Sequence, residues 1–201
     1  MSRKARVAVF ISGGGSNLQS LIDASKASKL SGKIVLVVSS KEEAYGLQRA
    51  KKAGIDTFVY RGKNYPSKEE AARDLFEMLA AYEVEYIALA GYMKLLPELI
   101  VRKYEDRITN IHPALLPKFG GKGMYGHHVH EAVLAAGEKE SGPTVHLVDE
   151  IYDNGRILMQ EKVPVLPEDT PDSLAARVLK AEHHLYPIAL DNLIKGKYSD
   201  E

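Results

Sequence analysis

Short, uninterrupted runs of apolar and β-branched residues alternate along the chain with longer stretches in which apolar residues recur every three or four positions. The runs are typical of strands buried on both faces, and the longer stretches are typical of amphipathic helices. This pattern predicts strands at 6–12, 33–40, 56–60, 85–92 and 107–112. It predicts helices at 17–28, 42–54 and 68–82, the second ending at Gly54 as its C-cap. Strand and helix alternating in this order predict a parallel sheet with helices on both faces.

The last third of the chain has a different pattern. Two strand-like runs, at 144–150 and 157–165, are joined by the turn-rich segment IYDNGR, which predicts a hairpin. A long helical stretch at 170–196 follows, with Thr170 as its expected cap and Pro171 in its first turn. The fold class predicted is therefore α/β, with a parallel sheet that becomes mixed near the C-terminus. The last few residues are expected to fray.

Composition narrows the class of protein. The 201 residues suit one domain, or one domain with a small extension, and 27 basic residues balance 27 acidic ones. A neutral balance predicts no binding to nucleic acid or to an anionic membrane surface, although a local basic pocket remains compatible with it. The lack of cysteine excludes disulfides, thiolate metal sites and cysteine nucleophiles. The first apolar run is too short for a signal peptide or a membrane span, so a cytoplasmic location is expected.

The segment SGGGSN, residues 12–17, connects the first predicted strand to the first predicted helix. Glycines let the backbone approach an anion, and the N–H groups that open a helix then point at it. A dinucleotide fingerprint would need a third glycine where Leu18 stands, and no lysine follows as in a Walker loop. A phosphate monoester therefore fits better than a dinucleotide or ATP. The alternative is a tight glycine turn in which Ser16 or Asn17 caps the helix.

The segment NIHP places Asn110 and His112 two residues apart at the end of a predicted strand. Residues i and i+2 of a strand point to the same face, and open α/β sheets bind ligands at the carboxyl ends of their strands. An amide N–H₂ beside an imidazole suits an oxyanion formed when a nucleophile attacks a carbonyl group. The alternative is a histidine bonded to a local backbone group.

Asp153 lies in the predicted hairpin turn YDNG, where an Asx residue before a glycine is an ordinary turn former. It gains a chemical role only if the turn folds over His112. A carboxylate near an imidazole raises the pKa of the imidazole and favours its protonated form, which can act as a donor or general acid.

Two further groups of polar residues are candidates for a chemical role. His127, His128 and His130 invite a metal interpretation, but no HExxH motif or cysteine accompanies them. The favoured interpretation is that they open a helix, with one or two of them facing a pocket. Glu182 is interpreted as a solvated helix residue, and the alternative is a role in binding an amine or ribose hydroxyls.

Several motifs together resemble the glycinamide ribonucleotide formyltransferase family, the folate-dependent enzymes of de novo purine synthesis. The motifs are SGGGSNLQSLI, AGYMKLLP, NIHPALLPKF, the block GHHVHEAVLAAGEKESGPTVHLVDEIYDNG, and EHHLYP. They cover the chain from about residue 6 to residue 196, in order and without large gaps. The HPALLP element is shared with other formyltetrahydrofolate enzymes, and its combination with SGGGSN near the N-terminus is more specific.

The resemblance implies a Rossmann-like fold in a single formyltransferase domain over residues 1–201, with a nucleotide-binding half to about residue 105 and a catalytic, folate-binding half from about residue 106. It implies formyl transfer from 10-formyltetrahydrofolate to the amino group of glycinamide ribonucleotide, without a metal, by a monomer or a homodimer. Catalytic roles are implied for Asn110, His112 and Asp153. Phosphate or nucleotide binding is implied for Ser12, Gly13, Gly14, Gly15, Ser16, Asn17 and Glu182. Folate binding is implied for Lys68, Met93, Lys94, Leu95, Leu96 and Asn110.

The chain departs from the family at a few positions. Lys68 stands where the family often has an arginine, and a lysine lacks the planar fork of a guanidinium. Gly14 stands where the family often has asparagine, an exchange that a backbone contact to phosphate would survive. The loop GGKGMYGHH is longer than in the shorter family variants, which bears on the shape of the folate pocket.

The mechanism implied is direct attack of a neutral amine on the formyl carbon. Asn110 and protonated His112 would stabilise the oxyanion, Asp153 would keep His112 charged and help move a proton through water, and His112 or this relay would protonate the departing folate nitrogen. A formyltetrahydrofolate hydrolase would usually carry an extra N-terminal domain, and a methionyl-tRNA formyltransferase a C-terminal tRNA-binding domain, for which the chain has no room. A non-catalytic nucleotide-phosphate binding module and a metal hydrolase are the alternatives from other classes.

Overall fold

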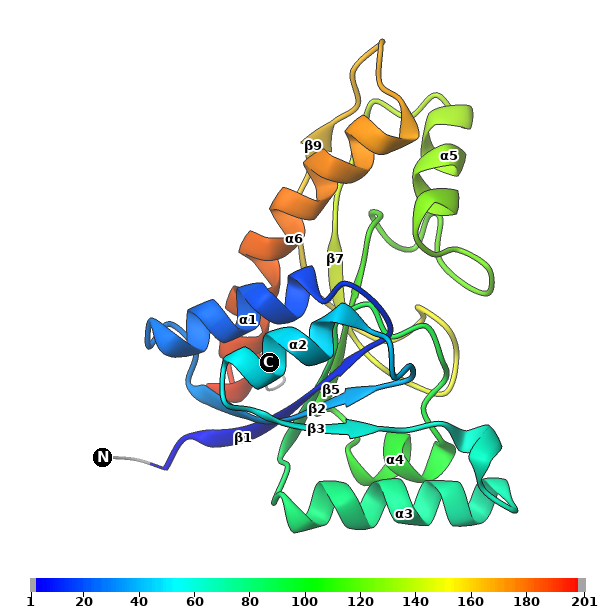
Figure 1. Cartoon of the computed structure of the whole chain (residues 1–201). Helices are drawn as coiled ribbons and strands as arrows, with labels where there is room; N and C mark the ends of the chain where they lie inside the picture. Colours follow the sequence, from blue (N-terminus) through cyan, green and yellow to red (C-terminus); the bar gives the residue numbers. More distant parts are fainter. Residues whose placement is uncertain (1–2, 199–201) are drawn as a thin grey trace.

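A seven-stranded sheet with helices on both faces forms the body of the computed structural model, which describes residues 3–198 (Figure 1). The parallel strands are β1 (Ala5–Ile11), β2 (Gly32–Ser39), β3 (Asp56–Val59), β4 (Tyr86–Leu89) and β5 (Ile108–His112). The antiparallel strands are β7 (Thr144–Leu147) and β8 (Ile157–Gln160). The spatial order is β3-β2-β1-β4-β5-β7-β8, so the chain reverses its direction of travel across the sheet between β1 and β4. Ligands of open α/β sheets bind at the carboxyl ends of strands at such a switch point.

Helices cover both faces of this sheet. One face carries α1 (Ser16–Lys26), α2 (Tyr45–Lys52) and α6 (Pro171–Ile194), and the other carries α3 (Lys68–Ala81) and α4 (Glu98–Lys103). The remaining elements are a 3₁₀ turn (Gly62–Asn64), α5 (His127–Ala135), and the two-residue strands β6 (Glu140–Ser141) and β9 (Val163–Pro164), which form a second small sheet. The predicted α/β class and the hairpin of β7 and β8 are therefore confirmed.

The central strand β1 shows why its sequence is continuously apolar. Val7, Val9 and Ile11 contact the α1 and α6 side, whereas Ala8 and Phe10 contact the α3 and α4 side, and all five side chains are fully buried. Side chains of a strand alternate between faces, so a strand covered on both sides needs an apolar residue at every position. Full burial of each larger side chain stabilises the fold by roughly 1.5–3 kcal/mol.

Helix α6 fixes the relation between the last third of the chain and the parallel sheet. Its N-terminus carries the predicted Thr170 cap and Pro171, as a capping box with Ser173. The Asp191 carboxylate accepts a hydrogen bond from the Ser31 N–H at the amino edge of the sheet. One and a half turns earlier, the Tyr186 hydroxyl donates to the carbonyl oxygen of Leu89, the last residue of β4. The preceding turn of α6, which contains Glu182, therefore lies near the carboxyl edge.

Several predicted boundaries were wrong for identifiable reasons. The strand predicted at 85–92 ends at Leu89, and the chain turns at Gly91, whose φ is +78°. The run predicted at 157–165 is two strands, because the chain crosses Gly142 so closely that a Cβ there would lie 1.8 Å from the Glu161 oxygen. The glycine predicted to end α2 is confirmed, since Gly54 has φ +70°, although the C-cap residue itself is Ala53.

Helix α4 was not predicted, because its six residues are too short for a clear period. The expectation of a frayed C-terminus concerns mainly residues 199–201, which lie outside the described range. Between residues 3 and 198, no helix is long and apolar enough to cross a membrane.

Candidate active site

Strand β5 carries Asn110 and His112 on one face at its carboxyl end. Thr109 and Ile111 alternate with them, and the Thr109 hydroxyl contacts Tyr186 of α6 on the opposite face. Neighbouring β7 runs antiparallel, and its residue His146 is directly opposite Asn110 in the pairing register. Directly opposite residues of an antiparallel pair share a face, so this edge of the sheet brings an amide and two imidazoles together.

The turn that contains Asp153 folds over this group. The Asp153 carboxylate accepts a hydrogen bond from the Gly121 N–H at 2.9 Å. Its oxygen Oδ2 lies 3.5 Å from Nδ1 of His112, and Oδ1 lies 3.4 Å from Nδ2 of Asn110. Gly155 permits this fold, since a Cβ there would lie 1.9 Å from the carbonyl oxygen of Leu147. The contact on which a chemical role of Asp153 depends is present.

Both ring nitrogens of His112 face acceptors. Nε2 lies 2.8 Å from the carbonyl oxygen of Phe119 and must therefore carry a proton, whereas Nδ1 faces Asp153. The side chain is almost completely buried, and this burial lowers the pKa of His112 even though the charge of Asp153 acts to raise it. The pKa is lowered overall. Asp153 therefore acts on His112 in the expected direction, but burial has the larger effect in this structure.

Asp153 itself is a carboxylate at neutral pH. Burial acts to raise its pKa, but the neighbouring His112 and the hydrogen bond from the Gly121 N–H act to lower it, and the pKa is lowered overall. The Asn110 amide N–H₂ and Nδ1 of His112 thus both face an ionised carboxylate. A negative charge near this place favours the protonated form of His112, in which Nδ1 is also a donor.

Two hydrogen bonds connect the carbonyl groups of the glycine loop to α2. The Gly46 N–H donates to the Gly13 carbonyl at 3.0 Å, and Nε of Arg49 donates to the Gly14 carbonyl at 2.8 Å. In a trans peptide the N–H points opposite to the C=O, so the N–H groups of Gly14 and Gly15 point away from α2. The alternative of a cap by Ser16 or Asn17 was wrong, because the N-cap of α1 is Gly15, at φ +70°.

A buried polar pair joins this loop to α6. Nδ2 of Asn17 donates to Oε2 of Glu182 at 2.6 Å, and Oδ1 of Asn17 has no partner within the described part of the chain. Glu182 is 8% exposed, and burial raises its pKa to about 7. The interpretation of Glu182 as a solvated helix residue was therefore wrong. An acid that titrates near neutrality is suited to exchanging protons with a bound amine.

Ser12 links the glycine loop to the segment that follows β4. Its hydroxyl accepts a hydrogen bond from the Met93 N–H at 2.8 Å and lies 2.7 Å from the hydroxyl of Ser40. The side chain is buried and both contacts are internal, so Ser12 positions the Met93–Leu96 segment in this structure.

The Met93–Leu96 segment borders a cavity of about 600 Å³. Lys94 and Leu95 line it, together with Ser40, Lys41, Glu43, Tyr60, Arg61, Gly62, Lys63 and Tyr92. Four basic residues against one acid give this lining a positive charge. Met93 and Leu95 are exposed, whereas Leu96 is buried in the core. Lys68, the exposed first residue of α3, is not part of the lining.

The histidine cluster opens α5, as predicted. His127 pairs with Asp172 and His128 with Glu131, both on the surface, whereas His130 is buried and its burial lowers its pKa to about 4. No group of three or more potential metal ligands exists among residues 3–198.

Sequence reasoning missed two residues of the site, Arg49 and His146. His146 lies two positions after Thr144 on the strand predicted at 144–150, so the two side chains share a face. This pattern could have marked His146 as a candidate. Its position opposite Asn110 depends on the register between β5 and β7, which the sequence does not display.

Comparison with known proteins gives a consistent picture. The family model described as "Formyl transferase" matches residues 5–190. A chloroplastic phosphoribosylglycinamide formyltransferase from Vigna unguiculata is 50% identical over 195 residues, which are 97% of this chain and 62% of that protein. A solved phosphoribosylglycinamide formyltransferase from Brucella melitensis is 49% identical, with a TM-score of 0.88 and 96% of each chain covered. A solved glycinamide ribonucleotide transformylase from Symbiobacterium toebii is 38% identical, with a TM-score of 0.93 and coverage of 100% of this chain and 92% of that one.

Proposed function

The chain belongs to the formyl transferase family, and on that premise we propose that it transfers the formyl group of 10-formyltetrahydrofolate to the amino group of 5-phosphoribosylglycinamide. The products are the N-formyl nucleotide and tetrahydrofolate, as a step of de novo purine synthesis. The relatives that bear this activity in their names support the substrate assignment. The observation that carries the proposal is the convergence of Asn110, His112 and Asp153 at the end of β5.

Formyl transfer requires groups that stabilise the oxyanion and a route by which one proton leaves the amine and one reaches the folate nitrogen. The neutral amine attacks the formyl carbon, and the carbonyl oxygen becomes an oxyanion that accepts a hydrogen bond from the Asn110 amide. The developing charge also favours a protonated His112, whose pKa burial otherwise lowers. Asp153 accepts the proton that the amine loses, directly or through water, and His112 or that water returns one proton to the departing folate nitrogen. One proton leaves the amine and one reaches the folate, so the transfer balances.

The nucleotide is proposed to bind with its phosphate at the glycine loop. The N–H groups of Gly14 and Gly15 point away from α2, and the N-terminus of α1 adds its dipole. Glu182 and Asn17 stand beside this loop as a buried pair with an unused acceptor, which suits an amine or ribose hydroxyls. The phosphate therefore lies at the loop and the amine extends toward β5.

The folate is proposed to lie along Met93–Leu96. The basic lining of the adjacent cavity complements the carboxylates of the folate glutamate. Lys94 is the cation that the Met93–Leu96 segment contributes to this lining. Lys68 is kept as a proposed contact, although it lies outside that lining. On this proposal the half up to about residue 105 supplies the glycine loop and the folate segment, and the half from about residue 106 supplies the catalytic groups and Glu182.

A spectrophotometric assay tests the proposal. The protein is mixed with 10-formyltetrahydrofolate or its dideaza analogue, with and without glycinamide ribonucleotide. We expect deformylation only with the nucleotide. Deformylation without it indicates a hydrolase, and no deformylation in either mixture indicates a binding module.

The location, oligomeric state, partners and metal independence of the protein can each be tested directly. We propose a cytoplasmic location and a monomer or homodimer, with no nucleic acid or membrane as a partner. Cell fractionation tests the location, because the Vigna relative is named as chloroplastic. Light scattering of the purified protein tests the oligomeric state, and activity that survives a strong chelator tests the expected independence from metal.

A further inference from the structure

His146 is buried beside the proposed catalytic group but has no role in the mechanism above. The residue is 2% exposed and lies opposite Asn110 in the antiparallel pairing of β5 and β7. Its Nε2 is 3.1 Å from Nδ2 of Asn110 and 3.5 Å from Oδ1 of Asp153. The amide of Asn110 is therefore the nearer of its two polar neighbours.

The other ring nitrogen of His146 fixes its tautomer. Nδ1 lies 2.7 Å from the carbonyl oxygen of Leu147, and a carbonyl oxygen only accepts, so Nδ1 carries the proton. When the ring is neutral this is its single N–H, and Nε2 then carries a lone pair. The backbone of β7 thus turns His146 into an acceptor that is aimed at Asn110.

An acceptor at this place decides which way the Asn110 amide is turned. The amide has a donating and an accepting end, and only the N–H₂ end can meet the Nε2 lone pair. In the flipped orientation, Oδ1 of Asn110 would face that lone pair and the Asp153 carboxylate together, which is repulsive on both sides. One N–H is thereby held by His146. The other points at Asp153 over 3.4 Å, a long contact that an oxyanion can replace.

We propose that His146 is a positioning residue that selects the amide orientation of Asn110, so that an N–H donor and not a carbonyl oxygen faces the reacting formyl group. This inference rests on the proposed formyl transfer and assigns a further residue to it. Without His146 the amide populates both orientations, and the flipped one offers the oxyanion no donor.

Two substitutions separate this role from a structural one. The amide nitrogen of asparagine can replace Nδ1, and the amide oxygen of glutamine can replace Nε2. His146→Asn therefore keeps the bond to the Leu147 carbonyl and loses the acceptor for Asn110, whereas His146→Gln does the reverse. We expect kcat of H146N to fall about tenfold or more, as for other residues that orient a ligating group. We expect H146Q to stay within about threefold of the unchanged protein, with KM for both substrates nearly constant in each variant.

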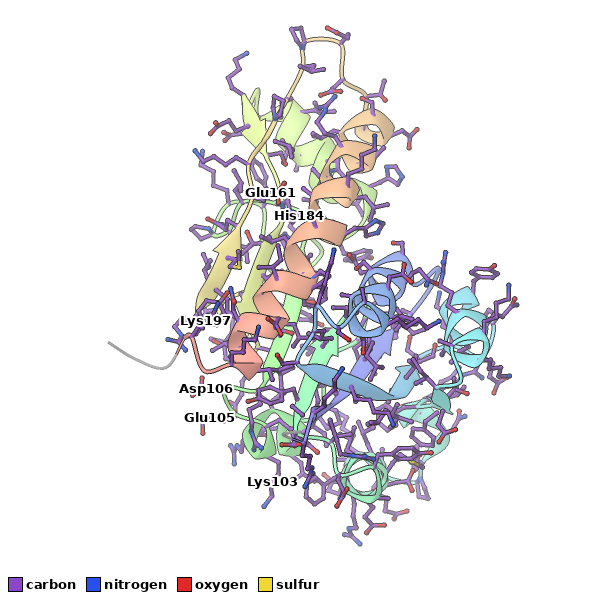
Figure 2. The ribbon with its side chains drawn as sticks, turned by 90° about the vertical axis from the view of Figure 1, so that its left-hand side faces the viewer. Lys103, Glu105, Asp106, Glu161, His184 and Lys197 are labelled. Carbon is purple, nitrogen blue, oxygen red and sulfur yellow. The ribbon has the colours of Figure 1, made fainter. Side chains whose placement is uncertain are left out.

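His184→Asn is the matched control. This histidine is exposed on α6, and its Nδ1 lies 2.9 Å from Oε2 of Glu161. Figure 2 labels both residues. Its substitution should leave kcat and KM unchanged. The unfolding midpoint of each variant is measured beside its kinetics.

A double-mutant cycle adds a readout that does not depend on how well H146N folds. In the Asn110→Ala background there is no amide to orient, so H146N and H146Q should each change the residual kcat by less than about twofold. The inference is overturned if H146N stays as active as H146Q, if H146Q is the more damaged of the two, or if both effects persist in the Asn110→Ala background. Lack of nucleotide-dependent deformylation by the unchanged protein refutes the proposed function instead, so the two failures are distinguishable.

Discussion

At the scale of single residues, the site is held by buried polar contacts around Asp153. His112 and His146 are 3% and 2% exposed, and each has a ring nitrogen 3.5 Å from this carboxylate. The spacing of Asn110 and His112 was sufficient to predict that they share a face. Their relation to Asp153 was not predictable, because it depends on how a turn 43 residues after Asn110 folds back.

The first prediction at this scale concerns Asp153→Asn. An amide cannot accept the amine proton as a carboxylate does, and it removes the negative charge beside His112. We expect kcat to fall by about 10²–10³, the range for losing one directly acting group. Binding of the nucleotide, measured by calorimetry, should remain nearly unchanged. Near-normal turnover of this variant contradicts the role of Asp153.

The second prediction concerns the stability of the protein as a function of pH. Glu182 titrates near 4.5 in an unfolded chain and near 7 in the folded protein. Between these values the folded state binds more protons, so the contribution of Glu182 to the free energy of unfolding is lost as pH rises to about 7. Glu182→Gln lacks this titration. Its stability relative to the unchanged protein should therefore increase by up to about 3 kcal/mol from pH 4.5 to pH 7.5, measured by urea unfolding. Parallel pH curves for the two proteins would refute the assignment.

At the scale of elements, close crossings of the backbone place the site and were the hardest feature to predict. The apolar runs predicted which segments are strands, because burial on both faces requires them. They did not show that the chain passes within contact of Gly142 and Gly155, where no side chain fits. These crossings split one predicted strand and direct Asp153 over β5.

Gly155→Ala tests the crossing beside the site. The added Cβ would lie 1.9 Å from the Leu147 oxygen, so the β7–β8 turn must move. We expect the free energy of unfolding to fall by about 2 kcal/mol or more, with a loss of kcat. Gly54→Ala is the control, since it has φ +70° but open space, and it should cost about 1 kcal/mol without affecting kcat. An equal decrease in the free energy of unfolding in both variants, together with full activity in both, would contradict this role of Gly155.

Arg49→Met tests how α2 supports the glycine loop. The variant loses the hydrogen bond from Nε to the Gly14 carbonyl and a positive charge near the proposed phosphate site. We expect KM for the nucleotide to rise about tenfold, as for the loss of one charge-assisted hydrogen bond, while kcat changes little. Gln48→Met, on the same helix at an exposed position, is the control. A fall in kcat at constant KM would place Arg49 in a different role.

At the scale of the whole molecule, the order of the strands brings the glycine loop and the proposed catalytic residues to one edge of the sheet. The switch between β1 and β4 places the glycine loop, the segment after β4 and the end of β5 side by side. Strand alternation was sufficient to predict the parallel sheet, and with it the carboxyl edge at which the site is proposed. It did not predict that α6 crosses to this edge, where Asn17 meets Glu182 across 165 positions of sequence.

The most direct test of the central claim is detection of the formylated nucleotide itself. The protein is incubated with 10-formyltetrahydrofolate and glycinamide ribonucleotide, and the nucleotide is analysed by mass spectrometry beside the folate absorbance. The account predicts that the nucleotide gains one formyl group for each tetrahydrofolate released, and that Asn110→Ala reduces this rate by about 10²–10³. Release of free formate without a formylated nucleotide, or full activity of the Asn110→Ala variant, would contradict it.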